Sequence, residues 1–164
     1  RGCMNRKVEL SEENYDLLDE VIHQLCEQGR LLEEQNAMQH GSTSVYEHSV
    51  NVAYKSLLLV ENYRLPVDKQ SLVRGALLHD YFLYDWHEKD GGHRLHGFRH
   101  PAFALYNASK DFSLNRKERN IIARHMFPLT VLPPRCLEAW IVCFVDKYCA
   151  FSETMGDGRI QWER

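Results

Sequence analysis

The sequence lacks any long hydrophobic run. No apolar stretch approaches the roughly 18 residues that a membrane-spanning helix requires, so no membrane partner is expected. The opening residues, RGCMNRKVEL, also lack the apolar segment of a signal peptide. Together these absences predict a cytoplasmic protein.

Strong net charge and paired cysteines are also missing. The formal net charge is only −3 across 164 residues, which gives no overall attraction to nucleic acid, so nucleic acid is not an expected partner. The chain has five cysteines, an odd number, and no Cys-x-x-Cys motif. These features exclude a disulfide framework and a cysteine-ligated zinc site, and they indicate reduced thiols.

Internal repeats, low-complexity tracts and interdomain linkers are absent, and no segment alternates β-branched residues as a strand does. Hydrophobic residues make up 44% of the chain, enough for one domain with its own core. The sequence therefore predicts one all-α domain over residues 1–164, a bundle of about five or six helices. Its core is expected at about 44–150, with an N-terminal helix packed on it and a frayed C-terminal tail.

Capping residues and prolines set the expected helix boundaries. Ser11 and Asp68 are predicted N-caps, and Asn115 with Glu118 has the spacing of a capping box. Pro101 suits the first turn of a helix, because the N–H that proline lacks would be unpaired there. The expected helices cover about residues 11–29, 44–62, 69–80, 101–111, 116–126 and 135–153, and loops are expected at QHGSTS and at 85–98.

Histidine and aspartate residues interrupt the apolar faces of these helices. His48 shares a helical face with Val45 and Val52, whereas Glu47 and Asn51 are expected toward solvent. A buried carboxylate without a partner is costly, and a cation removes that cost. Each such residue alone is typical of a hydrogen-bonded core position, but imidazoles and carboxylates together are the ligands of Zn, Mn and Fe. The ordered set predicts a metal centre with the ligands His48, His79, Asp80, His100, His125 and Asp146.

The order H…HD…H…H…D on a helical chain resembles the HD-domain superfamily of metal-dependent phosphohydrolases. The resemblance covers about residues 44–150 and also rests on the segments VYEHSVNVA, LLHD, HGFRHPAFAL and IIARHMFPLT. The six-ligand pattern is similar to the binuclear subgroups, which include diadenosine-tetraphosphate hydrolases, HD-GYP cyclic dinucleotide phosphodiesterases and myo-inositol oxygenase. It implies that His48, His79, Asp80 and Asp146 hold one metal, and that Asp80 bridges to a second metal completed by His100 and His125.

The chain departs from the binuclear pattern just after the His-Asp pair. Many binuclear members continue with Ile-Gly-Lys or Leu-Gly-Lys, whereas this chain continues with Tyr81, Phe82 and Leu83. The lysine that commonly faces the substrate is therefore missing, and neither a cyclic dinucleotide nor a diadenosine substrate is assigned. The resemblance still implies two divalent transition metals, foremost Fe or Mn, with Zn, Ni, Co or Mg as alternatives.

Hydrolysis of a phosphoester is the expected reaction. Two cations sharing Asp80 would activate a bridging hydroxide for attack on phosphorus, and Asp80 with His79 forms the expected catalytic pair. The expected substrate is a small phosphorylated molecule or nucleotide, bound as a phosphomonoester or phosphodiester. Lys147, beside Asp146, is the first candidate for binding its phosphate, followed by Lys55 and Arg99, although each position is also typical of a surface cation.

Three questions stay open at this point. A di-iron oxygenase resembling myo-inositol oxygenase would use a similar ligand set, and a non-catalytic HD-type module would bind a ligand without turnover. A homo-oligomer is compatible with the sequence. His87, His93 and His96 lie between two ligand segments and are equally typical of a lid, of proton donors or of a surface loop.

Overall fold

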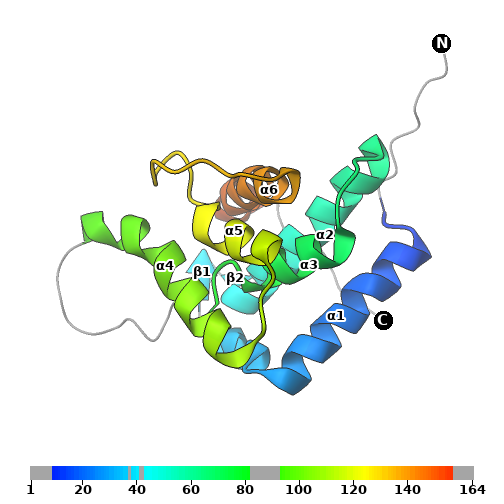
Figure 1. Ribbon diagram of the computed structural model, residues 1–164, viewed down its shortest axis with the longest axis horizontal. Helices are drawn as coiled ribbons and strands as arrows, with labels where there is room; N and C mark the ends of the chain where they lie inside the picture. The colour runs from blue at the N-terminus through cyan, green and yellow to red at the C-terminus, as the bar shows by residue number, and fades with distance from the viewer. Residues whose placement is uncertain (1–8, 37, 41–42, 82–92, 157–164) are drawn as a thin grey trace, which may run out of the picture.

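Six α-helices account for most of the chain in the computed structural model, which describes residues 9–36, 38–40, 43–81 and 93–156 (Figure 1). In chain order the elements are α1 (Glu12–Gln28), the 3-10 helix η1 (Leu31–Asn36), β1 (Met38–His40), β2 (Thr43–Ser44), α2 (Val45–Tyr63), α3 (Lys69–Leu78), α4 (His93–Asp111), α5 (Arg116–Arg124) and α6 (Leu137–Thr154). The predicted all-α class is confirmed. Across these described residues no helix is both long and apolar enough to cross a membrane.

The predicted helix starts agree with the capping hydrogen bonds. The Ser71 N–H donates to the Asp68 carboxylate at 3.1 Å at the start of α3. Asn115 and Glu118 form the expected reciprocal capping box at the start of α5. A second capping box at the start of α2 joins Ser44 and Glu47. It satisfies the backbone N–H groups of Ser44 and Glu47 and so fixes the helical turn on which His48 lies.

Two segments differ from the expected boundaries. Helix α4 begins at His93 and contains Pro101 in its interior, so the loop predicted at 85–98 is wrong for residues 93–98, while 85–92 lie outside the described residues. An interior proline removes only one backbone hydrogen bond, a loss that a helix of 19 residues tolerates here. Met38 pairs with Ser44, and His40 with Thr43, in a short antiparallel ladder where a loop was expected. These strands are too short to show an alternating pattern.

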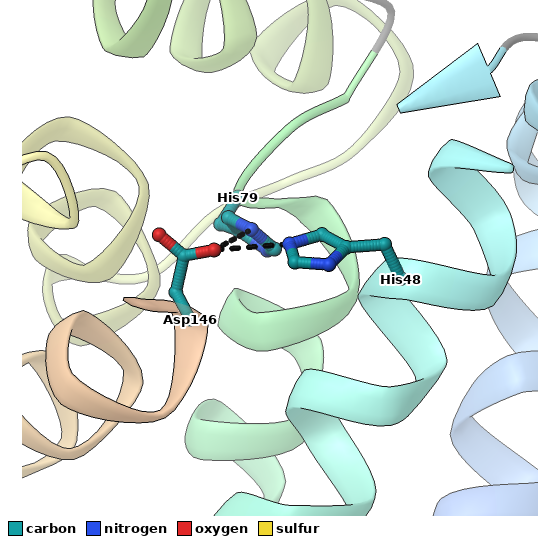
Figure 2. Close-up of side chains that lie close together, drawn as sticks. All are labelled: His48, His79 and Asp146. Carbon is teal, nitrogen blue, oxygen red and sulfur yellow. Dashed lines mark hydrogen bonds and ion pairs between the residues drawn. The ribbon is translucent and has the colours of Figure 1, made fainter. Parts of the chain in front are cut away.

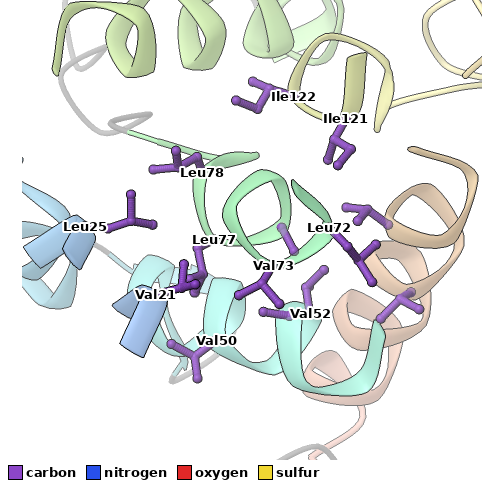
Figure 3. Close-up of a cluster of buried hydrophobic side chains, with 14 of the residues drawn as sticks. Val21, Leu25, Val50, Val52, Leu72, Val73, Leu77, Leu78, Ile121 and Ile122 are labelled. Atoms are coloured by element: carbon purple, nitrogen blue, oxygen red, sulfur yellow. The ribbon is translucent and has the colours of Figure 1, made fainter. Parts of the chain in front are cut away.

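Helix α3 lies at the centre of the bundle. It packs against α1, α2, α5 and α6, and its own residues Leu72, Val73, Leu77 and Leu78 are fully buried (Figure 3). The opposing side chains come from distant parts of the chain, such as Val52 of α2 and Ile121 of α5. Because neighbours surround α3, its C-terminal end opens into the interior of the bundle and not into solvent.

Gly75 permits the close approach of α3 and α5. A Cβ atom at this position would lie 2.4 Å from Cδ1 and 2.9 Å from Cβ of Ile121. We expect Gly75→Ala to destabilise the fold by about 1–3 kcal/mol, because overpacking outweighs alanine's higher helix propensity. Chemical denaturation measures this. Ile121→Val removes Cδ1, so the double variant should cost less than the sum of the two single variants. Equal or greater stability in Gly75→Ala would contradict the packing argument.

Candidate metal centre

All six predicted ligands converge on one place inside the bundle. His48 comes from α2, His79 and Asp80 from the end of α3, His100 from α4, His125 from the end of α5, and Asp146 from α6. His48, His79 and His125 are completely buried, and Asp80 is 2% exposed. Ionisable groups withdrawn from water to this degree require charged or hydrogen-bonding partners. Here they are the partners of one another.

Two of the histidines are oriented by the same local device. His79 and His125 each occupy the C-cap position of a helix. The His79 Nδ1–H donates to the carbonyl of Ala76 at 2.6 Å, and the His125 Nδ1–H donates to the carbonyl of Ile122 at 2.8 Å. A carbonyl three residues back thus fixes each ring, and Nε2 is left as the atom that faces the centre.

One group of ligand atoms joins α2, α3 and α6. Nε2 of His48 lies 3.0 Å, and Nε2 of His79 lies 3.4 Å, from the same oxygen, Oδ1 of Asp146 (Figure 2). The candidate ligand atoms of these three residues all lie within 4.8 Å of one another. Two nitrogens and one oxygen therefore surround one small volume.

The carboxylate of Asp80 faces both ends of the cluster. Its Oδ2 lies 3.3 Å from Nε2 of His79 and 4.0 Å from Nε2 of His48. Its Oδ1 lies 3.3 Å from Nε2 of His125 and within hydrogen-bonding distance of Nε2 of His100. The two latter nitrogens are 3.2 Å apart. A carboxylate with one oxygen toward each pair of imidazoles has the placement of a bridging ligand.

Two observations indicate that the cluster fits a divalent cation. Nε2 of His79 is buried and has no hydrogen-bond partner, although it is the ring atom directed at the centre. His79, Asp80 and His125 form a second group of atoms within 4.8 Å, so His79 belongs to both groups. Imidazole nitrogen and carboxylate oxygen are the donor set of Zn, Mn and Fe. A cation would coordinate this nitrogen and the neighbouring carboxylates of Asp80 and Asp146 at once.

Electrostatic coupling inside the cluster is strong. Burial opposes charge on His48, but its hydrogen bonds with Asp146 and Glu153 raise its pKa to about 9. Burial likewise opposes charge on His79, yet the Asp80 and Asp146 carboxylates hold its pKa well above the ordinary value. Burial would raise the pKa of Asp80, but His79 and His100 hold it well below the ordinary value. Without a metal, the carboxylates therefore hold protons on His48 and His79 that a bound cation would displace.

The comparison with protein families agrees with this geometry. The family model described as HD domain matches residues 45–150, more than half of the chain. The chain belongs to the HD-domain family. Domains of this family commonly act as metal-dependent phosphohydrolases and typically bind divalent metal ions. No curated protein and no solved structure gives a significant match to the chain.

The three predicted phosphate-binding cations lie in different environments. The Lys147 ammonium donates to the backbone carbonyls of His125 at 2.8 Å and Cys143 at 3.2 Å, so it helps to hold the end of α5. Nζ of Lys55 lies 4.9 Å from the ring centroid of Tyr148. Arg99 is exposed on α4, directly before His100. A contact of any of them with phosphate stays a prediction.

Sequence reasoning missed two residues that support His48. Glu153 is 8% exposed, and its Oε2 accepts from the His48 Nδ1–H at 2.8 Å. The Asn51 side chain donates to Glu153 Oε1 at 3.1 Å and is buried, so its expected position toward solvent was wrong. A signal was present in the sequence, because Glu153 follows Asp146 by seven residues and so lies on the same face of α6.

Tyr81 explains part of the departure from the binuclear pattern. Its ring is fully buried, and its hydroxyl donates to Asp111 at 2.6 Å while it accepts from the Arg30 backbone N–H at 2.9 Å. The residue after the His-Asp pair thus ties the end of α3 to α4 and to the segment before η1. Phe82 and Leu83 lie outside the described residues, as does His87. His93 and His96 belong to α4 and not to a loop.

Proposed function

We propose that the protein is a metal-dependent phosphohydrolase that acts on a small phosphorylated molecule or nucleotide. The observation that carries the proposal is the placement of Asp80, a buried carboxylate with one oxygen toward His79 and the other toward His100 and His125. Two divalent transition metals, Fe or Mn, match this donor set. The membership in the HD-domain family supports the reaction class.

The chain's own residues have distinct roles in this proposal. His48, His79, Asp80 and Asp146 would hold one metal, and His100 and His125 would hold the second with Asp80. When bound, the metals lower the pKa of water and offset the negative charge of a phosphoryl group. Asp80 would contact both metals, and the carbonyls of Ala76 and Ile122 keep the imidazoles of His79 and His125 directed at the centre. The burial of the ligands excludes bulk water, which strengthens each electrostatic interaction.

A combined metal analysis and substrate screen tests the proposal. Protein purified without chelator is analysed for bound elements, and a panel of phosphomonoesters, phosphodiesters and nucleotides is then assayed with Mn²⁺ or Fe²⁺. We expect two metals per chain and metal-dependent release of phosphate. Dioxygen uptake with a polyol and no phosphate release would assign an oxygenase instead. Tight nucleotide binding without turnover would assign a binding module.

We expect side-chain cations elsewhere in the chain to bind the substrate phosphate, because the lysine that usually follows the His-Asp pair is missing. We expect Lys147→Ala to lower kcat/KM about ten- to a hundred-fold, the range for a charge-assisted hydrogen bond. Lys55→Ala and Arg99→Ala are the comparison variants, each assayed for metal content and melting temperature. A kinetic loss in Lys147→Ala that parallels lost metal would assign it to the support of His125 alone. Full activity in all three variants would show that the metals alone bind phosphate.

A further inference from the structure

Glu153 is a charged group outside the six ligands that contacts one of their imidazoles. Its carboxylate lies on the Nδ1 side of His48 at 2.8 Å, while the Asp146 carboxylate lies on the Nε2 side at 3.0 Å. Both acids come from α6, two helical turns apart. The ring of His48 therefore lies between two carboxylates of one helix, although His48 and Glu153 are 105 residues apart in the chain.

The support of His48 differs from that of the other buried imidazoles. His79 and His125 donate from Nδ1 to neutral backbone carbonyls of their own helices. His48 lies in the first turn of α2, where the backbone carbonyls accept hydrogen bonds within the helix, so its Nδ1 requires a partner from elsewhere. Glu153 provides that partner, and the Asn51 amide holds the second Glu153 oxygen at 3.1 Å. An anionic acceptor increases the basicity of the opposite nitrogen more than a neutral carbonyl does.

We propose that Glu153 is a positioning residue for the metal centre, which orients His48 and strengthens Nε2 of this imidazole as a ligand. The inference rests on the proposed function only for the presence of a metal, and not for the reaction. Loss of the carboxylate leaves the Nδ1–H of a completely buried ring without its acceptor, so the ring is free to rotate away from Asp146. Mutation of a residue that hydrogen-bonds to a metal ligand typically lowers metal affinity about 10–100-fold.

Cobalt titration of three variants tests the role of Glu153. Co²⁺ gives visible absorption bands that report both affinity and ligand geometry, independently of turnover. We expect Glu153→Gln to weaken Co²⁺ binding about ten-fold and Glu153→Ala about a hundred-fold, with altered bands. Glu138→Gln is the matched control, because Glu138 is an equally buried carboxylate at the other end of α6 and accepts from Lys117 and the Asp68 backbone. It should lose stability but retain the wild-type affinity and spectrum.

The outcomes separate this role from the proposed reaction. If both Glu153 variants lose stability as Glu138→Gln does but bind Co²⁺ like the wild type, Glu153 is structural and the inference is wrong. If the wild type binds Co²⁺, the Glu153 variants bind it weakly and no phosphoester is hydrolysed, the inference holds and the phosphohydrolase proposal fails. A wild type that binds no divalent metal overturns both.

A second inference comes from the outer face of α6, which lies at the edge of the bundle (Figure 1). Phe144, Tyr148, Phe151 and Met155 are 61–69% exposed, and Leu137 is 40% exposed. Trp140 lies beside them, stacked on Phe144 with ring centroids 5.8 Å apart. At 100° per residue all six fall within an arc of about 80°. We call this set the α6 outer face.

The side chains of the α6 outer face form a large apolar and aromatic surface. Its five most exposed side chains present on the order of 600 Å² of surface, at the upper limit for a patch on a typical monomer. Two cations flank the face. The Lys147 ammonium donates to the His125 carbonyl of its own chain, and Nζ of Lys55 lies 4.9 Å from the ring centroid of Tyr148. Two copies related by a two-fold axis would place the same aromatic row against itself over the length of an 18-residue helix. With its rim, such an interface approaches the roughly 800 Å² per partner of a stable complex.

We propose that the α6 outer face is the interface of a homodimer. Sedimentation equilibrium of the full chain at 1–100 µM, on the order of typical dimer constants, measures the mass against 19.3 kDa for one chain. We expect a dimer, and we expect the double variant Phe144→Glu/Phe151→Glu to weaken it at least a hundred-fold while metal content and melting behaviour stay unchanged. Tyr106→Glu, at an exposed aromatic of α4, is the control and should remain dimeric.

A monomeric wild type at the highest concentration would overturn the dimer. Truncation after Met155 then tests what covers the face. If only the truncated chain forms a dimer, the cover belongs to the C-terminal residues of the same chain. A double variant that stays dimeric would place the interface elsewhere and would equally overturn the proposal.

Discussion

Replacing Asp80 with alanine is expected to remove bound metal and hydrolytic turnover together. The two oxygens of Asp80 face both pairs of imidazoles, so its loss leaves His79, His100 and His125 without the carboxylate that lies between them and would balance a cation. We expect metal occupancy to fall to near zero and kcat/KM to fall by at least about a thousand-fold, or about 4 kcal/mol of transition-state stabilisation. Elemental analysis and the phosphoester assay on one sample measure both.

Comparison variants show whether the loss belongs to the bridge or to instability. Asp68→Ala removes the N-cap at the opposite end of the same helix and should cost about 1 kcal/mol while metal content stays intact. His100→Ala and His125→Ala should lose mainly the second metal. If Asp80→Ala retains two metals and wild-type turnover, the assignment of Asp80 as the bridge is wrong.

The metal-free protein is expected to lose stability as the pH rises from about 6.5 to 9, whereas the metal-loaded protein is not. The folded pKa of His48 is raised to about 9 from its ordinary 6.5, because Asp146 and Glu153 outweigh the effect of burial. A raised pKa gives stability that is complete below the unfolded pKa and is lost as the pH passes the folded pKa. A shift of this size corresponds to about 3 kcal/mol. In the metal-loaded protein the cation has displaced the proton of His48, so stability no longer depends on the titration of this imidazole.

Urea unfolding at pH 6 and pH 9, with EDTA or with Mn²⁺, measures both arms of this prediction. Metal affinity should increase over the same interval, because fewer protons compete for the imidazoles. The stabilisation by Mn²⁺ should therefore be greater at pH 9 than at pH 6 at equal free metal concentration. If the free energy of unfolding of the metal-free protein is the same at pH 6 and pH 9, the coupling of His48 to the two carboxylates is contradicted.

Local signals in the sequence predicted most of the fold. Capping bonds are made within three residues, so Asp68 and the pair Asn115 and Glu118 could be placed without tertiary information. Pro101 misled the analysis because a proline is common at a helix start, whereas here the helix extends eight residues before it. The β1–β2 pair is defined by its ladder contacts and has no sequence period of its own.

The candidate site was predictable where the chain follows an ordered motif and not where a contact depends on packing. All six proposed ligands are brought together, because each lies at a helix edge or end that faces the interior. Glu153 was missed because its spacing from Asp146 places it on the same face of α6 but does not reveal its contact with His48, which is 105 residues away. Lys147 was selected for its position beside Asp146, but sequence spacing does not reveal that its ammonium reaches the His125 carbonyl.

The wide spacing of the ligands along the chain has a kinetic consequence. The contact between His48 and Asp146 closes a loop of 98 residues. Contacts of such separation carry a large loop-closure entropy and form late in folding. The assembled centre is therefore expected to be absent from the folding transition state, so a bound metal should slow unfolding and leave the folding rate nearly unchanged. Metal supply would then set how long each folded molecule survives, and not how quickly it is made.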